Sequence, residues 1–252
     1  MSEVAGLGAL VTGGGRGIGA AIATALTRSG AEVTILGRNQ AALAARVKAG
    51  DAARYVVADV TDEIGFAAIV TKLAADGTID ILVNNAGAAI SAPFLKTGSS
   101  DFHRMLNVNL MGPMIATQAI LPGMIARKFG RIVNIASTAA LKGYPYVSAY
   151  VASKHALLGL TRSLAVELAK SGVTVNAVCP GFTDTDMVGT SVETVVAKTG
   201  RTAEAVRAEF TKSNPMGRLI APEEVADAVC FLARRDSGAI TGTAIAVAGG
   251  EI

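Results

Sequence analysis

The sequence predicts a doubly wound α/β fold built on a seven-stranded parallel sheet. Seven short runs rich in Val, Ile and Leu alternate with segments of helical pattern along the 252 residues. The runs are almost continuously apolar, which is typical of parallel strands covered by helices on both faces. A glycine-rich turn directly follows the first run, at the place where doubly wound folds bind phosphate groups. These three observations together favour this fold class over an all-helical or all-strand chain.

The expected elements follow one another in a regular order. Strands are expected at 7–12, 32–37, 53–58, 80–87, 130–137, 172–181 and 243–250. Helices are expected at about 18–29, 39–49, 63–75, 100–127 and 150–170. Each assignment depends on the length and period of the apolar residues. The chain has no internal repeat, low-complexity tract or linker, so residues 1–252 are expected to form a single domain.

The segment 183–214 departs from this alternation. It is polar, helical in pattern and inserted between the sixth and seventh strands. In a doubly wound fold it would lie above the carboxyl ends of the strands, where ligands bind. We therefore expect a helical substrate lid there. Its basic and acidic residues are mixed, so a clamp for a phosphate or carboxylate group is not evident.

The composition favours a large core and argues against nucleic-acid binding. Hydrophobic residues make up 51% of the chain and aromatic residues only 4%, with no Trp to form stacking platforms. The net charge of +3 is spread over the chain without a basic run. Cys179 and Cys230 lie in apolar contexts without Cys or His neighbours, so we expect buried thiols and no metal site. Neither a signal peptide nor a membrane-spanning apolar run is found, and we expect a cytoplasmic protein without membrane contact.

The turn after the first strand, "TGGGRGIG", predicts a nucleotide site. Gly13, Gly17 and Gly19 lie between a strand and its helix, where missing side chains let the backbone approach a pyrophosphate at the helix N-terminus. Glycine also serves ordinary tight turns. Its position directly after the first apolar strand favours the nucleotide interpretation.

The end of the second strand indicates which dinucleotide is bound. An NAD site places a carboxylate there for the ribose 2′-hydroxyl, whereas an arginine suits a 2′-phosphate. Here Arg38 follows Gly37, and no residue from Val33 to Gly50 is acidic. Arg16, inside the glycine turn, could face the same phosphate. We therefore favour NADP(H) over NAD(H), although both arginines could also be solvated surface residues.

Tyr150 and Lys154, four residues apart in "SAYVASKHAL", stack on one face of a helix. A tyrosine titrates near pH ~10, so a tyrosine working as a base near neutrality needs nearby positive charge or hydrogen bonds to the phenolate. Lys154 could supply part of this effect. The pair taken alone is more typical of a core tyrosine beside a snorkelling lysine.

The order of the motifs resembles that of the short-chain dehydrogenase/reductase family. The motifs are "TGGGRGIG", "NNAG" (84–87), Asn109 in "NVNL", Ser137 in "NIAS", Tyr150 with Lys154, and "PG" (180–181). They cover essentially the whole chain, and Ser137 precedes Tyr150 by the family's usual separation. The resemblance implies a Rossmann fold and an oxidoreductase that transfers a hydride between a nicotinamide and a carbonyl or alcohol.

The resemblance also implies the roles of the catalytic residues. Tyr150 would give a proton to the carbonyl oxygen, and Lys154 would lower the tyrosine pKa and hold the nicotinamide ribose. Ser137 would hydrogen-bond the substrate oxygen and steady its developing charge. Asn109 would anchor a water that connects Lys154 to solvent.

Further cofactor contacts carry over from the family position by position. Asp59 would meet the adenine amine beside Val60, and Ile18 would lie at the pyrophosphate. Asn84 would border the adenosine ribose, or it would serve only the backbone of neighbouring strands. The complete set of expected cofactor-binding residues is Gly13, Gly15, Arg16, Gly17, Ile18, Gly19, Arg38, Asp59, Val60, Asn84, Ala86, Gly87, Tyr150, Lys154, Pro180, Gly181, Thr183 and Thr185.

Several segments resemble the 3-oxoacyl reductase branch of the family, which acts on acyl-carrier and acyl-CoA substrates. The expected pocket wall is mostly apolar and consists of residues 88–90, Thr138, Ala139, Leu141, Tyr144, Tyr146, Phe182 and Met187. A small basic cluster of Arg127, Lys128 and Arg131 could meet an acidic carrier or CoA phosphates, or be a solvated helix end. Carrier-docking relatives often have Arg where Ser171 stands, which leaves acyl-CoA or a free ketone open.

Three functions are compatible with the sequence. The first is an NADP(H)-dependent reductase of a 3-oxoacyl thioester. The second is a dehydrogenase or reductase of an alcohol, hydroxysteroid or small ketone. The third is a catalytically silent protein that senses the cofactor, for which an intact Ser137, Tyr150 and Lys154 would be superfluous. The resemblance also implies a homotetramer.

Overall fold

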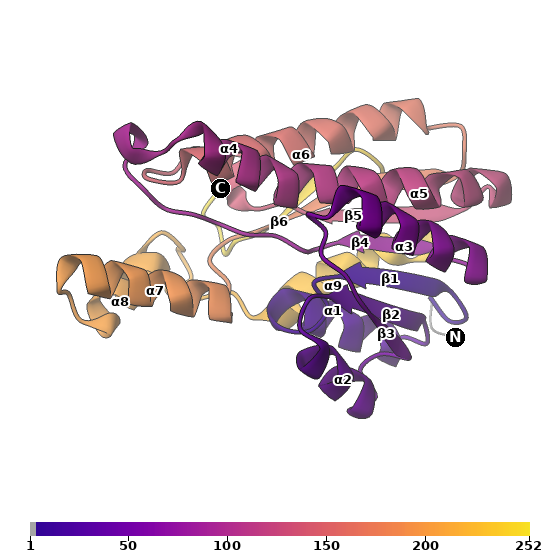
Figure 1. The fold of residues 1–252 in the computed structure, drawn as a ribbon, viewed down its shortest axis with the longest axis horizontal. Coiled ribbons are helices and arrows are strands. Elements are labelled where there is room, and N and C mark those ends of the chain that lie inside the picture. The colour runs from indigo at the N-terminus through magenta and orange to yellow at the C-terminus, as the bar shows by residue number, and fades with distance from the viewer. Residues whose placement is uncertain (1–3) are drawn as a thin grey trace.

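The computed structural model describes residues 4–252, except for the side chains of Met187 and Lys198, and its strands form a seven-stranded parallel sheet (Figure 1). The strands are β1 (Gly8–Thr12), β2 (Glu32–Gly37), β3 (Arg54–Val57), β4 (Ile81–Asn84), β5 (Gly130–Ile135), β6 (Val173–Pro180) and β7 (Ala244–Val247). Their order across the sheet is β3-β2-β1-β4-β5-β6-β7. The predicted fold class is confirmed.

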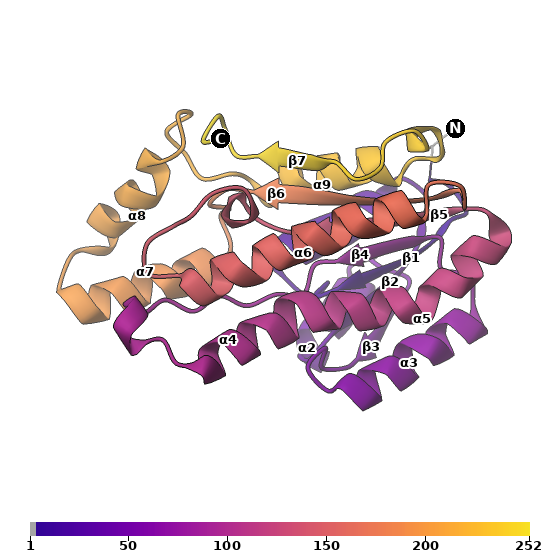
Figure 2. The same cartoon turned by 90° about the horizontal axis from the view of Figure 1, so that it is seen from above.

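Helices cover both faces of the sheet (Figures 1 and 2). One face carries α1 (Gly17–Arg28), α2 (Gln40–Lys48) and α9 (Pro222–Ala233). The other carries α3 (Glu63–Asp76), α5 (Gly112–Arg127) and α6 (Ser148–Glu167), and α4 (Ser99–Leu106) packs against α6. The sheet is therefore the middle of three layers.

Successive residues of β1 supply opposite faces of the sheet. Ala9 and Val11 belong to the core beneath α1 and α9, whereas Leu10 belongs to the core beneath α3, α5 and α6. Side chains alternate across a strand, so a strand covered on both sides has no solvated face. This is why the strand sequences are almost continuously apolar.

Helix α9 is the one long helix of the covering layers that the sequence analysis did not predict. It begins with Pro222 in its first turn, followed by Glu223 and Glu224, which are ordinary signals of a helix start. Val225, Val229 and Leu232 are buried in the core that α9 shares with α1. These residues follow a helical spacing.

The predicted helix at 100–127 is continuous but not uniform. Between α4 and α5 lies η2 (Asn107–Met111), one turn of π-helix that contains Asn109. Such turns are frequent at functional sites. By length and composition the run Ser99–Arg127 could cross a membrane, but 44% of its apolar window is buried inside the structure, as in the core helix of a globular domain.

The sheet order places a crevice between β1 and β4. The chain runs outward from β1 through β2 to β3, and returns to start again at β4 on the other side of β1. Connections therefore leave these two neighbours in opposite directions, and ligands of doubly wound folds bind outside the carboxyl ends of such strands. The glycine turn follows β1 and the "NNAG" motif follows β4.

The segment 183–214, which we call the inserted segment, forms two helices. They are α7 (Asp186–Thr199) and α8 (Ala203–Lys212), and they project beyond the sheet beside the ends of the strands (Figures 1 and 2). Val192 and Val206 are their buried apolar residues among those described. The helical character of the segment is as predicted.

Candidate active site

The glycine turn after β1 is packed too closely for side chains. Gly13 has a φ of +69°, a left-handed conformation that glycine adopts without strain. A Cβ on Gly19 would collide with the Gly13 carbonyl oxygen and the Asn85 side chain. The turn, including Gly15 and Arg16, leads into α1 at Gly17. The free N–H groups of this first helical turn, which includes Ile18, attract phosphate.

Hydrogen bonds across the crevice hold the glycine turn against the residues that follow the carboxyl end of β4. The Thr12 hydroxyl accepts from the backbone N–H groups of Asn85 and Ala86, both at 3.0 Å. The Asn85 side-chain amide donates back to the carbonyl oxygens of Thr12 at 2.9 Å and Gly13 at 3.3 Å. Sequence reasoning missed Thr12 and Asn85, although Asn85 is the second Asn of the "NNAG" motif. Their contacts join two motifs that are 72 residues apart.

Arg38 lies at the carboxyl end of β2 with 74% of its side chain exposed. Its guanidinium is 3.7 Å from the Asp59 carboxylate, which also accepts from the Thr61 N–H at 2.9 Å and hydroxyl at 2.8 Å. Burial alone would raise the pKa of Asp59, but the Thr61 hydrogen bonds and Arg38 hold it below its ordinary value. Asp59 is therefore ionised and anchored, and most donors of Arg38 remain free for another anion.

Asn84 is buried between strands. Its amide donates to Asn134 Oδ1 at 2.8 Å and to the Thr117 hydroxyl at 3.4 Å, while its Oδ1 lacks a partner among the described residues. Both partners are side chains, of β5 and α5, and not the backbone of neighbouring strands that the sequence analysis gave as the alternative role. Val60, also buried, packs against Gly112 at the start of α5.

Ser137 and Tyr150 meet at the end of β5. Ser137 follows the strand and caps the short helix η3 (Thr138–Ala140), where its hydroxyl accepts from the Ala139 N–H at 3.1 Å. Tyr150 lies in the first turn of α6. Burial raises the pKa of Tyr150, and a hydrogen bond from Ser137 offsets part of this effect. The phenol therefore holds its proton at neutral pH and is placed to act as an acid.

Lys154 lies one turn further along α6, on the same face as Tyr150. Only 4% of the residue is exposed. Its ammonium donates to the Ile135 carbonyl oxygen at 2.8 Å and lies 5.8 Å from the centre of the Tyr150 ring. Burial lowers the pKa of Lys154 to about 8. The lysine therefore remains mostly charged at pH 7, close to the phenol.

Asn109 reaches the catalytic residues from η2. Its side chain is fully buried, donates to the Ala88 carbonyl oxygen at 2.9 Å and to the Ser153 hydroxyl at 3.0 Å, and accepts from the Ala88 N–H at 3.1 Å. It thereby ties the loop after β4 to α6. A Cβ on Gly87 would lie 3.1 Å from Asn109 Oδ1 and 3.6 Å from Lys154 Nζ. This glycine allows the loop to pass closely over both residues.

Cys179 is a further residue of this centre that sequence reasoning assigned only to the core. It is completely buried in β6. Burial raises the pKa of its thiol, while the Ser137 backbone and the Lys154 charge act in the opposite direction. The thiol is therefore neutral and lies beside the catalytic side chains. Both cysteines are free thiols, and Cys230 is partly buried.

The predicted "PG" motif forms the exit from β6. Pro180 ends the strand, and the Gly181 N–H donates to the Val247 carbonyl oxygen at 3.0 Å. The Thr183 hydroxyl donates to the Gly181 carbonyl oxygen at 3.0 Å. The Thr185 hydroxyl donates to the Thr183 carbonyl oxygen at 3.3 Å. Thr185 also touches the glycine turn, because its methyl group would be 3.2 Å from a Cβ on Gly17. The motif thus leads the chain from the sheet to the crevice.

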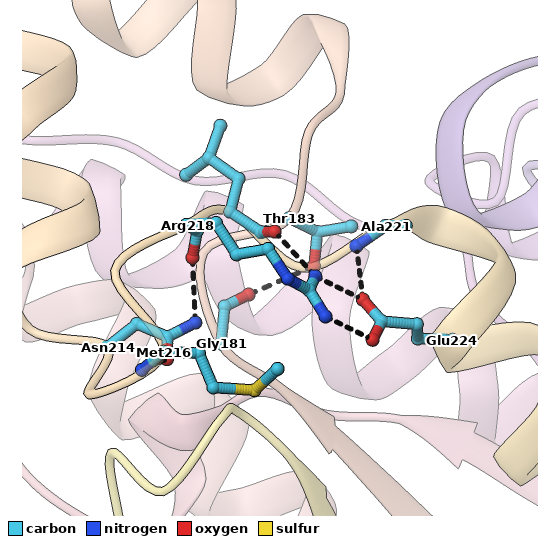
Figure 3. Close-up of polar contacts among 8 residues, drawn as sticks. Gly181, Thr183, Asn214, Met216, Arg218, Ala221 and Glu224 are labelled. Carbon is cyan, nitrogen blue, oxygen red and sulfur yellow. Dashed lines mark hydrogen bonds and ion pairs between the residues drawn. The ribbon is translucent and has the colours of Figure 1, made fainter.

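The returning end of the inserted segment is held by a compact polar network (Figure 3). Arg218 makes a two-pronged ion pair with Glu224, with both contacts at 2.7 Å, and the Ala221 N–H donates to the same carboxylate at 2.8 Å. The Asn214 side chain donates to the Arg218 carbonyl oxygen and accepts from the Met216 N–H. The segment therefore departs and returns through ordered loops.

The predicted pocket residues divide by exposure. Leu141 and Tyr146 are exposed, whereas Thr138 and Ala139 are buried; Ala89 is exposed in the loop after β4. The Met187 side chain lies outside the described residues. Phe182 makes an edge-on contact with Tyr144 and stacks on Phe210 of α8, with ring centres 6.2 and 4.7 Å apart. An aromatic wall therefore connects η3, the loop after β6 and the inserted segment.

The surface cluster suggested for Arg127, Lys128 and Arg131 does not exist as such. Arg131 is 3% exposed and donates to the carbonyl oxygens of Arg234 and Arg235, at 2.9 and 2.8 Å. Arg127 is 3.4 Å from the Asp80 carboxylate and donates to the Ile79 carbonyl oxygen. Both guanidinium groups of the three side chains thus hold the fold, because their donors are needed by buried acceptors.

Comparison with known proteins shows the family of the chain. A family model described as enoyl-(acyl carrier protein) reductase matches residues 13–251. The fold and the site define an oxidoreductase with a dinucleotide-binding sheet. The chain belongs to the short-chain dehydrogenase/reductase family, as the sequence analysis predicted.

Several relatives cover the full chain. Oxidoreductase UcpA of Escherichia coli is 40% identical over 100% of this chain and 96% of its own length. Acetoacetyl-CoA reductase of Shinella zoogloeoides is 40% identical over 100% of this chain and 99% of its own. Among solved structures, an actinorhodin polyketide ketoreductase with NADPH has a TM-score of 0.92 at 34% identity, with 97% of both chains covered. A putative NAD(P)-dependent gluconate 5-dehydrogenase of Beutenbergia cavernae with bound NADP has a TM-score of 0.88 at 38% identity, covering 98% of this chain and 97% of its own.

Proposed function

We propose that this oxidoreductase is an NADP(H)-dependent reductase of a ketone, with a 3-oxoacyl thioester as its substrate. The observation that carries the proposal is the meeting of Ser137, Tyr150 and Lys154 at the carboxyl ends of the strands, beside a glycine turn shaped for a dinucleotide. The named activities of the acetoacetyl-CoA reductase and the polyketide ketoreductase support this substrate class.

The residues fit a nicotinamide dinucleotide by their shape. The turn leaves no room for side chains at Gly13 and Gly19, and the first N–H groups of α1 have no partner within the helix. Asp59 with Val60, and Ala86 with Gly87, would border the adenosine half. Gly181, Thr183 and Thr185 would hold the nicotinamide half. The cofactor, when bound, supplies the hydride.

The side chains of the protein supply the proton and steady the charge. Tyr150, protonated at neutral pH, would donate to the substrate carbonyl oxygen, and the Ser137 hydroxyl would hydrogen-bond the same oxygen. Lys154 would stabilise the resulting phenolate by its charge and hold the ribose hydroxyls. The Asn109 side chain is already occupied by Ala88 and Ser153, so the water proposed to connect Lys154 with solvent would bind the Asn109 backbone.

The preference for NADP(H) depends on Arg38. A 2′-phosphate adds nearly two negative charges, and charge-assisted hydrogen bonds are about twice as strong as neutral ones. We expect NADPH to bind at least about tenfold more tightly than NADH, a difference of ~1.4 kcal/mol. Fluorescence titration of wild type and Arg38→Ala with both cofactors tests this. The variant should lose the preference, and equal affinities in the wild type would refute it.

The inserted segment would act as the substrate lid of one domain that spans residues 1–252. The exposed faces of α4, α5 and α6 would meet other copies in a cytoplasmic homotetramer of closed dihedral symmetry. Light scattering would then report about four times the 25.5 kDa mass of one chain. A monomer at all concentrations would refute the tetramer but would leave the proposed reaction unaffected.

A substrate panel tests the reaction itself. NADPH oxidation is followed by absorbance with 3-oxoacyl thioesters of CoA and of an acyl carrier, small ketones, and alcohols with NADP⁺ in the reverse direction. We expect the highest kcat/KM with a 3-oxoacyl-CoA. Turnover of none of these, with NADPH still bound, would favour a cofactor-sensing protein.

A second candidate is a dehydrogenase of an alcohol or polyol. It is favoured by the likeness to the putative gluconate 5-dehydrogenase and by the lack of an evident phosphate clamp in the inserted segment. In the same panel it would oxidise alcohols faster than it reduces thioesters.

A further inference from the structure

The C-terminal tail after β7 carries a buried carboxylate close to the catalytic residues. The Glu251 side chain is 1% exposed. Its Oε1 accepts from the Tyr144 hydroxyl at 2.5 Å and lies 3.1 Å from Lys142 Nζ. Lys142 also donates to the Glu251 backbone oxygen at 3.2 Å. Carboxylates are rarely buried unless they are paired, so these contacts indicate a dedicated arrangement.

Tyr144 connects this carboxylate with the reaction centre. Its hydroxyl oxygen is also 2.7 Å from the Thr138 hydroxyl, which donates to it because the single phenol proton goes to the carboxylate. Thr138 directly follows Ser137 in the chain. On its other side the Tyr144 ring meets Phe182 edge-on. Tyr144 is therefore fixed at both ends, by hydrogen bonds at its hydroxyl and by an aromatic contact at its ring. It is the residue of the expected pocket wall whose hydroxyl meets Thr138, the chain neighbour of Ser137.

The same tail touches both ends of the inserted segment. Gly249 lies so close to the Asn214 side chain that a Cβ there would collide with it, and Gly250 lies beside Pro215. At the other end, Glu251 Oε2 would be 3.1 Å from a Cβ on Gly181. Residues 249–251 therefore lie where the exit loop of β6, the return loop of the segment and the loop of Tyr144 meet.

One oxygen of this carboxylate has no hydrogen-bond partner among the described residues. Glu251 Oε2 is buried without a donor, and leaving an acceptor unpaired in the interior costs stability. Tyr144 could bind Thr138 without the carboxylate, so the fold alone does not require it. A costly buried group beside a reaction centre is more readily explained by function than by stability.

We propose that Glu251 is a positioning residue for the substrate, which holds the Tyr144 hydroxyl against Thr138 and so sets the pocket wall beside Ser137. The proposal rests on the proposed ketone reductase function. Glu251 itself does not reach the reacting atoms. Its effect on catalysis passes through Tyr144, and it couples the C-terminal tail to substrate binding.

Three variants separate positioning from simple folding. Glu251→Ala removes the acceptor of Tyr144, whereas Glu251→Gln keeps its size and one carbonyl acceptor. Tyr144→Phe removes the donor. On the best substrate of the panel, Glu251→Ala and Tyr144→Phe should each lower kcat/KM about tenfold, mainly through KM, because a charge-assisted hydrogen bond that shapes the wall is lost. Glu251→Gln should recover most of this loss, and the Kd of NADPH should change less than about twofold.

The double variant Glu251→Ala with Tyr144→Phe tests whether the two residues act through one bond. If they do, its loss should equal that of either single variant, because the same interaction is removed twice. Asp76→Asn is the matched control, since Asp76 makes an exposed pair with Lys72 at the end of α3. Losses that multiply, or a loss in NADPH affinity as large as that in KM, would overturn the proposal.

A measurement without substrate keeps this test separate from the test of the reaction. Burial and the hydrogen bond to Glu251 raise the pKa of Tyr144, and the hydrogen bond with Thr138 lowers it. The charges of Glu251 and Tyr150 raise this pKa further. The Lys142 ammonium faces the Tyr144 ring. The chain has four tyrosines, so carbon-13 labelling at Cζ resolves each. Glu251→Gln should lower the pKa of Tyr144 toward its ordinary value, because the carboxylate charge and its hydrogen bond are lost. An unmoved titration would refute the positioning contact even if no substrate were turned over.

Discussion

The glycine turn after β1 and the inserted segment lie at the same edge of the sheet but are held in different ways. The turn is enclosed by backbone atoms and by the paired hydrogen bonds of Thr12 and Asn85, and a single added carbon at Gly19 would collide with its neighbours. The helices of the inserted segment bury few apolar side chains, Val192 and Val206 among them. An added carbon at Gly189 in α7 would meet no atom within 4 Å.

This difference matches what each region has to recognise. The proposed dinucleotide site has to let a pyrophosphate approach the backbone closely, which closely packed glycines allow. The proposed substrate wall, in contrast, depends on contacts between a few side chains: Tyr144, Phe182, Phe210 and Glu251. Regions with few buried contacts open most easily, which suits a segment that admits substrate.

The largest effect is expected from Gly19→Ala in the turn. The new methyl group would collide with the Gly13 carbonyl oxygen and the Asn85 amide, and neither can move without breaking the contacts across the crevice. We expect a loss of about 3 kcal/mol or more in the free energy of unfolding and no measurable NADPH binding. Urea unfolding and cofactor titration measure both. A variant with wild-type affinity would show that the turn is more tolerant than its packing indicates.

Tyr150→Phe should cause the next largest effect, on the rate alone. The ring and its packing remain, but the proton that must reach the carbonyl oxygen is gone. General acid–base catalysis by one group contributes roughly 10²–10⁴ in rate, so kcat should fall at least about a hundredfold, with the Kd of NADPH nearly unchanged. Steady-state kinetics decides this. If most of the activity survived, the acid would lie elsewhere.

Lys154→Met should abolish activity and yet stabilise the protein. Burial lowers the pKa of Lys154 from 10.5 to about 8, so below pH 8 the folded state holds an ammonium that it disfavours, by about 3 kcal/mol. Losing the hydrogen bond to Ile135 costs about 1 kcal/mol. The variant should therefore gain about 2 kcal/mol at pH 7.

The pH dependence of the stability gained by Lys154→Met is the control for this prediction. The unfolded lysine keeps its proton up to about pH 10.5, whereas the folded one loses it from about pH 8. The free energy of unfolding of the wild type therefore rises as the pH increases from about 8 to 10.5. Over the same range the difference in stability between Lys154→Met and wild type becomes smaller. Denaturant unfolding at pH 7, 9 and 10.5 measures it. A variant that is less stable than wild type at pH 7 would contradict the prediction.

The smallest effect is expected from Gly189→Ala in the inserted segment, the counterpart of the change at Gly19. Alanine is favoured over glycine inside a helix by up to about 1 kcal/mol, and the site offers free space. We expect slower hydrogen exchange of the α7 amides, and kcat/KM within about threefold of wild type. A loss of stability comparable to that at Gly19 would remove the contrast between the two regions.

Two of the features recognised from the sequence have positions that local chain geometry determines, whereas Asn109 and Ser137 were assigned from the resemblance to the family. Tyr150 and Lys154 lie on one face because a helix repeats every 3.6 residues, and the glycine turn leads into a helix because it follows a strand. Helix α9 was missed although Pro222, Glu223 and Glu224 mark its start. The basic cluster was misread, because nothing local shows that Arg131 turns inward to the carbonyl oxygens of Arg234 and Arg235.

By itself, the sequence determined the class of fold and the order of the strands, since these follow from the periodicity of apolar residues. The motifs of the proposed reaction centre came from the resemblance to a known family. Only the tertiary structure decided which distant side chains complete the site. Asn85 reaches Thr12 across 73 residues, and Glu251 reaches Tyr144 across 107. Such contacts arise from the order of strands in the sheet and from the path of the tail, which bring together residues that no local pattern connects.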